Sequence, residues 1–227
     1  MLRTAELICR RGLNPPLPCI LAVVGCGGKT SLIKQLAADM QGKTVLISPT
    51  TKMYPLNVGT ADCIGVPNHQ TGKLEALPPD ELASLAPRYD IVLLEADGSR
   101  SLPCKGWLED EPVVPGYCTH TVGVVTLSAL GKPATGERVH NLPQFLALTG
   151  LREGQEITMQ ALRDMVCAPQ GMFKNSAGQR ILLVNQVEDE PTACAAREFL
   201  QGIKARRPGF FERLLFGSVY QDSWQEV

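Results

Sequence analysis

Short apolar runs alternate along this chain with segments in which apolar residues recur at helical spacing. The run at residues 19–24 has the continuous apolar character of a buried strand, and residues 32–40 repeat apolar positions along one face of a helix. A short helix carrying Leu2, Ala5, Ile8 and Cys9 is predicted before a proline-rich break at 14–18. The same rules predict strands over 44–48, 91–95, 121–127, 180–184 and 214–220, a weaker strand over 61–66, and helices over 79–85, 142–148, 158–166 and 191–206.

This alternation predicts an α/β fold with a mostly parallel sheet. Parallel neighbours need crossover connections, and helices in those connections cover both faces of the sheet. We therefore expect a single three-layer domain over residues 1–227. The helical segment 141–172 interrupts the alternation and is predicted to form a small subdomain or lid within that domain.

The composition is that of a globular protein. The chain has 227 residues, of which 44% are apolar and 20% are charged, and its formal net charge is -1. A charge so close to zero argues against a protein that coats nucleic acid or an anionic membrane. The longest apolar run falls far short of the roughly 18 residues of a membrane span, and the N-terminus lacks the pattern of a secretory signal. The eight cysteines are scattered singly, which is typical of reduced thiols. We therefore expect a cytoplasmic protein with no nucleic-acid or membrane partner.

The sharpest motif lies between the first predicted strand and the helix that follows it. There the chain has a short GxxGKT form of the phosphate loop, and Val23 stands where the longer motif has its first glycine. Glycines allow main-chain N–H groups to turn towards an anion, and the helix N-terminus adds its partial positive charge. The lysine would reach the terminal phosphates and the threonine would bind Mg²⁺. The motif predicts binding of Mg²⁺ with ATP or GTP by Gly25, Cys26, Gly27, Gly28, Lys29, Thr30 and Ser31. With this loop, the expected three-layer domain resembles the P-loop NTPase fold.

Two carboxylates follow the predicted strand at 91–95, and they are the candidate catalytic acids. Glu95 and Asp97 would lie at the carboxyl end of that strand, where an acid can hold Mg²⁺ or orient an attacking group. Either one can take the metal while the other takes the water, so both are predicted as metal and catalytic residues together with Lys29. Thr50 and Thr51 follow another strand and would reach the same edge of the sheet. An ordinary strand exit explains these two threonines equally well.

A candidate base-reading segment follows the strand at 180–184. Asn185 and Gln186 resemble the start of the NKxD signature of GTP-binding proteins, with glutamine in the lysine position and Glu188 or Asp189 as the acid. An asparagine amide and a carboxylate can read the edge of a purine. Asp189 is also typical of a helix N-cap, because an acidic residue and a proline follow it. The choice between ATP and GTP stays open.

Several other polar residues are candidates for the site. Cys26 lies at a helix N-terminus, a position that can lower a thiol pKa, although its small size in a tight turn explains it as well. Five further residues are candidates for contact with phosphate or substrate, and each is also typical of a solvated surface: Arg100, Lys105, Lys132, Arg138 and His140.

In this order the motifs resemble the YqeC family of accessory proteins of selenium-dependent molybdenum hydroxylases. The matching segments are residues 25–30, Thr50-Thr-Lys52, Glu95-Ala-Asp-Gly-Ser-Arg100, Leu130-Gly-Lys-Pro133, His140 and Asn185-Gln-Val187. The resemblance implies a nucleotide-binding protein that acts in the maturation of those enzymes, with the hydroxylase or its cofactor as partner. It also implies phosphate contacts from the glycine loop, metal or catalytic roles for Glu95 and Asp97, and a base contact from Asn185.

Two functions are compatible with these residues. The first is an NTPase or phosphotransferase, in which Lys29 stabilises charge and the two acids serve the metal and the attacking group. The second is a nucleotide-gated chaperone or cofactor-delivery protein with little or no turnover. Both require the nucleotide, and only the first requires chemistry on it.

Overall fold

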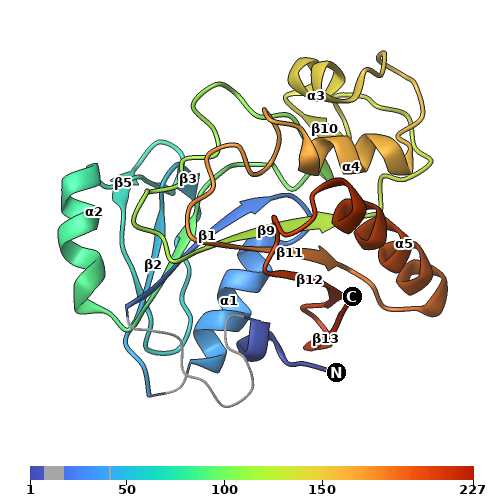
Figure 1. Ribbon diagram of the computed structural model, residues 1–227. Coiled ribbons are helices and arrows are strands. Elements are labelled where there is room, and N and C mark those ends of the chain that lie inside the picture. Colours follow the sequence, from blue (N-terminus) through green and yellow to red (C-terminus); the bar gives the residue numbers. More distant parts are fainter. Residues whose placement is uncertain (8–17, 41) are drawn as a thin grey trace.

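An eight-stranded sheet forms the centre of the protein, as the computed structural model shows for residues 1–7, 18–40 and 42–227 (Figure 1). Its strands are β1 Cys19–Gly25, β2 Val45–Pro49, β4 Asp62–Cys63, β7 Ile91–Glu95, β9 His120–Thr126, β11 Gln179–Asn185, β12 Arg213–Ser218 and β13 Ser223–Glu226. Their order across the sheet is β13-β12-β11-β9-β1-β7-β2-β4. All neighbours pair in parallel except β12 and β13.

Helices cover both faces of this sheet (Figure 1). One face packs against the α-helix α1 Lys29–Asp39 and the short 3-10 helix η1 Thr4–Leu7, and the other against α2 Pro79–Leu85, α4 Met159–Cys167 and α5 Glu190–Arg206. Strand β1 contributes side chains to the hydrophobic core on each face of the sheet. Leu21 and Val23 point to the α1 side, while Ala22 and Val24 point to the α5 side. The 3-10 helix η2 Ala86–Arg88 continues α2, and α3 Leu142–Thr149 packs on α4.

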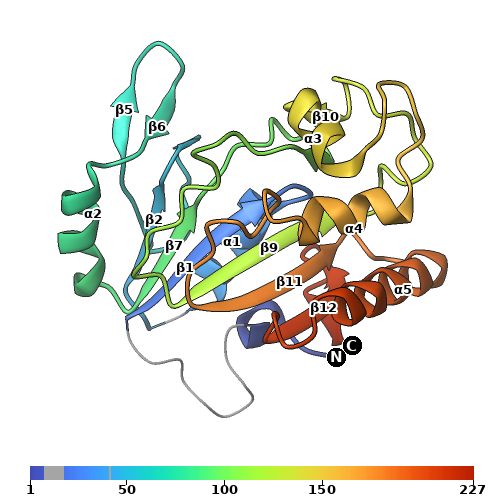
Figure 2. The same ribbon diagram turned by 45° about the horizontal axis from the view of Figure 1, so that its top comes forward.

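Shorter strands form two small sheets outside the central one. The antiparallel sheet has the order β3-β6-β5 and consists of β3 Lys52–Met53, β5 Val66–Asn68 and β6 Lys73–Glu75. A parallel pair joins β8 Cys104–Lys105 to β10 Val139–His140. Figure 2 shows the β5–β6 hairpin at one side of the central sheet and α3 at the other.

The structure confirms the predicted α/β class and most of the predicted elements. Strand β7 and helix α2 have the predicted bounds, and most other predicted bounds differ by one or two residues. The weak strand over 61–66 is wrong as one unit, because the chain leaves the central sheet after β4 and β5 belongs to the small antiparallel sheet. The apolar pattern does not predict the edge strand β13 or the short strands of the small sheets. Of the predicted N-terminal helix, only η1 is seen, and residues 8–17 lie outside the described part of the chain.

The central strands β1, β2, β7, β9 and β11 run in the same direction, so their carboxyl ends meet at one edge. Strands β7 and β2 lie on one side of β1, and β9 and β11 lie on the other. In open parallel sheets, ligands bind where the strand order diverges in this way. This edge is therefore where the candidate site is expected.

Among the described residues, every helix is too short or too polar to traverse a lipid bilayer.

Candidate functional site

The glycine loop, residues 25–28, joins β1 to α1 at this edge of the sheet. Gly25, Gly27 and Gly28 all have positive φ angles, of 98°, 100° and 115°. A side chain at Gly27 would come within 2.8 Å of Thr126, and one at Gly28 within 2.5 Å of Asn185. Only glycine combines this backbone conformation with such close walls. The loop is therefore a tight main-chain cradle.

The cradle presents free main-chain donors. Gly28 caps α1 without a side-chain hydrogen bond, and the first N–H groups of any helix lack partners within the helix. Within the described residues, the main-chain N–H groups of Gly27, Gly28 and Thr30 have no hydrogen-bond partner. The N–H of Cys26 differs, because it donates to the main-chain oxygen of Val124 at 2.8 Å. The donors available to an anion are thus those from Gly27 onwards.

Lys29 points into the cradle and is 4% exposed. Its ammonium donates to the main-chain oxygen of Gly25 at 2.6 Å and to Ser99 Oγ at 3.3 Å, and it lies 3.2 Å from Asp97 Oδ1. Burial would lower the pKa of Lys29, but the negative charges of Asp97 and Glu95 outweigh it, so the pKa rises above its usual value. The lysine therefore carries a permanent positive charge beside the free N–H groups.

Thr30 and Glu95 form a second polar pair at the mouth of the loop. The Thr30 hydroxyl donates to Glu95 Oε2 at 3.0 Å. Glu95 is the last residue of β7 and is 8% exposed. Burial raises the pKa of its carboxyl group, and the charge of Lys29 and the bond from Thr30 oppose that rise. A hydroxyl beside a carboxylate supplies the oxygen ligands that Mg²⁺ prefers.

Asp97 does not reach the same place. Its side chain is fully buried, and its oxygens accept hydrogen bonds from the Gly25 N–H, at 3.0 Å to Oδ2, and from Trp107 Nε1 at 2.7 Å. It lies between the ammonium groups of Lys29, at 3.2 Å, and Lys105, at 3.7 Å. The structure thus separates the two predicted acids. Glu95 faces the opening, whereas Asp97 holds the glycine loop and Lys29 from behind.

Asn185 and the acids after it have structural partners. Asn185 Nδ2 donates to the main-chain oxygen of Gly27 at 2.8 Å, and its Oδ1 accepts from the Val219 N–H at 2.9 Å. Asp189 caps α5 by accepting from the Thr192 N–H at 2.8 Å, which is the helix-cap alternative from the sequence. Glu188 accepts from Ser218 Oγ. The side chain of Asn185 thus ties the glycine loop to the end of β12.

Gln186 differs from Asn185, because its exposed side chain borders the opening. Its Oε1 accepts from the hydroxyl of Thr126 at 2.6 Å, and the residue has a φ angle of 65°. Of the segment predicted to read a base, Gln186 is therefore the residue that the structure brings to the site.

The thiol of Cys26 is unsuited to nucleophilic chemistry. It is fully buried and donates to the main-chain oxygen of Pro103 at 3.0 Å. Burial raises its pKa to about 12. A thiol of this kind stays protonated near neutral pH, so Cys26 fills the tight turn and is no reactive thiolate.

A cavity of about 770 Å³ opens above the glycine loop. On the β9 and β11 side it is bordered by Thr126, Ser128 and Gln186, and on the β7 and β2 side by Glu95 and Thr51. Ser31 also lines it, whereas Thr50 is buried and donates to the main-chain oxygen of Val113 at 2.6 Å. The floor of the cavity consists of Gly27, Gly28, Lys29 and Thr30.

The other predicted cations divide into two groups. Arg100 and His140 line the cavity, and burial, followed by the charges of Lys105 and Arg100, lowers the pKa of His140. Lys105 is fully buried and bonds to Gly98 and to Glu111, 2.8 Å away. Lys132 and Arg138 are not among the cavity residues.

The structure adds residues that sequence patterns did not indicate. Ser99 contacts Lys29 and could have been found from its place beside the acids. Trp107 gave no signal, because its bond to Asp97 depends on how a loop folds back. Tyr54 and Lys73 line the cavity from the small antiparallel sheet, whose strands are too short to be predicted.

Together these features define an α/β protein with a glycine-rich cradle and a paired hydroxyl and carboxylate at the carboxyl edge of a parallel sheet. The family model described as "YqeC protein" matches residues 21–143. The chain is 32% identical over 213 residues to the "Uncharacterized protein YqeC" of Escherichia coli strain K12, covering 82% of this chain and 83% of that protein. The chain therefore belongs to the YqeC family. A search of solved structures gave no match.

Proposed function

We propose that this protein binds ATP or GTP with Mg²⁺ in the cavity above the glycine loop and hydrolyses the nucleotide or transfers its terminal phosphoryl group. The observation that carries the proposal is the cradle itself. Main-chain N–H groups without a partner, a helix N-terminus and a charged lysine border the same cavity, and such a combination binds phosphate. In this proposal the fold is that of a P-loop NTPase.

Thr30 and Glu95 are the residues that would hold Mg²⁺. No three His, Cys, Asp or Glu side chains cluster as metal ligands in the part of the chain that the structure describes. Mg²⁺ is usually bound by one or two protein oxygens, with substrate phosphates and water completing its shell. The Thr30 and Glu95 pair fits that pattern. A bound Mg²⁺ would neutralise charge on the terminal phosphates, while Lys29 supplies further positive charge beside them.

The placement of Asp97 favours slow turnover and so supports the second function, a nucleotide-gated partner. If Glu95 serves the metal, the sealed carboxylate of Asp97 is unavailable to orient an attacking group. Chemistry would then depend on an acceptor or a partner protein. We further propose, on family membership and the motif resemblance, that the partner is a selenium-dependent molybdenum hydroxylase or its cofactor during maturation.

Calorimetric titration with non-hydrolysable ATP and GTP analogues, with and without Mg²⁺, tests the proposal. Wild type should bind at least one analogue, more tightly with Mg²⁺, and Thr30→Val should lose the Mg²⁺ dependence. Lys29→Ala should weaken binding on the order of a hundredfold, as expected for a lost charge-assisted contact. Lys34 is an exposed lysine on the same helix, so Lys34→Ala is the matched control and should bind as wild type does.

Phosphate release then separates the two functions. Steady-state turnover that is lost in Lys29→Ala supports the enzyme, whereas nucleotide-dependent capture of the hydroxylase without turnover supports the gated partner. Circular dichroism of each variant verifies the fold. If folded wild type binds neither analogue, the proposal is wrong.

A further inference from the structure

The cavity extends beyond the glycine loop towards the small antiparallel sheet, and this outer part has its own chemistry. Met53 and Tyr54 at β3 and Lys73 at β6 line it on one side. The segment Gly98–Pro103 lines it on the other side and carries Arg100. Ser99 of this segment bonds to Lys29, whereas Tyr54, Lys73 and Arg100 lie outside the phosphate cradle. The outer part is therefore a second set of potential ligand contacts.

Two cations in the outer part form no direct ion pair among the described residues. Lys52 is paired with Glu75 at 2.9 Å. By contrast, no carboxylate within the described residues lies within ion-pair distance of Lys73 or Arg100. Lys73 does interact with the charge of Glu95, which lines the same cavity: burial raises the pKa of that carboxyl group, and Lys73 is one of the groups that oppose the rise. Cations without a direct ion pair that line one cavity attract an anion, because a concave surface concentrates their field.

An aromatic ring lies beside one of these cations. The ammonium of Lys73 lies over one face of the Tyr54 ring, 4.9 Å from its centre, and Tyr54 as a residue is 63% exposed. An exposed ring that borders a cavity offers a surface on which a planar ligand can stack. Thr51 also lines the cavity, and its hydroxyl is buried and has no hydrogen-bond partner among the described residues. A buried hydroxyl without a partner is costly unless a ligand or water satisfies it.

The outer part lies on the metal side of the glycine loop. Thr30 and Glu95 lie towards β7 and β2, and the chain continues from β2 through Thr51 into β3. The bordering residues Ser128 and Gln186 lie on the opposite side, near β9 and β11. A nucleotide with its terminal phosphates at Thr30 would therefore extend away from Tyr54 and leave the outer part open.

From these observations we infer that the outer part of the cavity binds a second ligand, a small planar aromatic or heteroaromatic molecule that carries a phosphate or carboxylate group. Tyr54 stacks on the ring, and Lys73 and Arg100 bind the anionic group. This inference deepens the proposed function and rests on it for the placement of the nucleotide. The ligand then lies next to the terminal phosphates, which is the position of a second substrate.

Fluorescence titration with 1-naphthyl phosphate tests the inference, with the better-binding non-hydrolysable nucleotide and Mg²⁺ held at saturation. Wild type should bind the probe saturably in the presence of the nucleotide. Lys73→Met and Tyr54→Ala should each weaken it on the order of tenfold, and Tyr54→Ala should leave the affinity for nucleotide unchanged. Lys34→Met is the matched control for loss of a lysine. 1-Naphthol and inorganic phosphate should both bind far more weakly than the probe, and 1-naphthoate identifies whether a carboxylate suffices.

The outcomes separate this inference from the proposed function. If the nucleotide binds but the probe does not, or if neither substitution changes the affinity for the probe, the proposal of a second site is wrong and that of the nucleotide site stands. Displacement of the probe by the nucleotide also overturns the second site. If no nucleotide binds while the probe binds through Lys73 and Tyr54, the anion site stands and the proposed function fails.

Discussion

Replacing Asp97 by asparagine tests the buried network behind the glycine loop. Asp97 is fully buried between the ammonium groups of Lys29 at 3.2 Å and Lys105 at 3.7 Å, and it accepts from the Gly25 N–H and from Trp107. Removing one partner of a buried ion pair costs about 3–5 kcal/mol. Asparagine keeps the shape of the side chain, and Lys105 retains the carboxylate of Glu111 at 2.8 Å. We therefore expect the free energy of unfolding to fall by about 3 kcal/mol, the lower end of that range.

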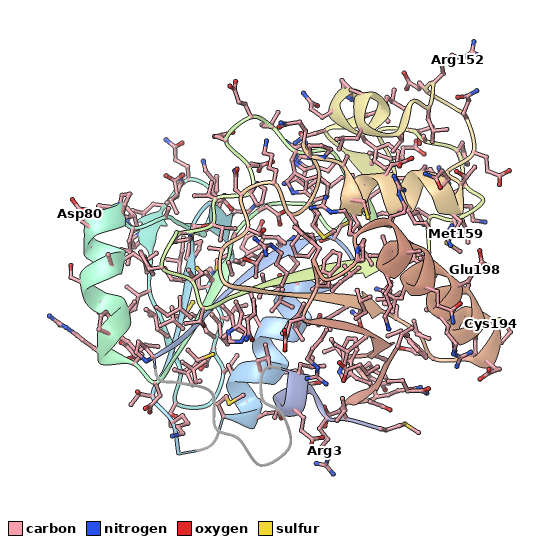
Figure 3. All side chains as sticks on the ribbon, viewed as in Figure 1. Arg3, Asp80, Arg152, Met159, Cys194 and Glu198 are labelled. Atoms are coloured by element: carbon pink, nitrogen blue, oxygen red, sulfur yellow. The ribbon has the colours of Figure 1, made fainter. Side chains whose placement is uncertain are left out.

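Urea denaturation followed by tryptophan fluorescence measures this loss, and Trp107 reports directly on the contact. The matched control is Glu198→Gln, which breaks a surface ion pair of 3.4 Å with Arg163, where the Glu198 side chain is 68% exposed. Figure 3 shows Glu198 on the outer side of α5, far from the glycine loop. The control should cost less than about 1 kcal/mol. If the free energy of unfolding fell equally in the two variants, the buried network would not stabilise the protein as we propose. Unchanged stability with lost Mg²⁺ dependence would instead make Asp97 the metal ligand.

Three further predictions concern single residues of the site. Asn185→Ala should weaken ATP and GTP binding by the same factor and lower the free energy of unfolding by about 2 kcal/mol, since two hydrogen bonds are lost; calorimetry showing only a lost guanine preference would restore the base-reading role. Burial raises the pKa of Glu95, so Mg²⁺-dependent affinity should fall as the pH decreases, beginning above the range in which an exposed glutamate titrates. Glu95→Gln should remove this pH dependence, and a wild-type affinity that is flat with pH would exclude Glu95 as a ligand. With the Cys26 pKa raised to about 12, iodoacetamide at pH 8 should modify the exposed Cys194 and spare Cys26; mass spectrometry showing rapid alkylation of Cys26 in folded protein would contradict its burial.

The α/β class, the order of most elements and the location of the glycine loop follow from the amino-acid sequence alone. These features are local, because apolar periodicity within about ten residues separates a buried strand from an amphipathic helix. A glycine loop between a strand and a helix needs no knowledge of distant residues either. Hence β7 and α2 were predicted with their observed bounds, while β13 was missed, since a four-residue edge strand has too short a pattern.

Which polar residues share the site becomes visible only in the folded protein. Glu95 and Asp97 are two residues apart, and nothing in the sequence indicates that β7 ends between them and sends Asp97 behind the loop to Gly25 and Trp107. The role of the Asn185 side chain likewise depends on its contact with the glycine loop, which is far away in the chain. The physical reason is that a buried charge or amide takes the partners that surround it when the layers pack. Those partners come from segments that are far apart in the sequence, and no spacing pattern predicts that these segments meet.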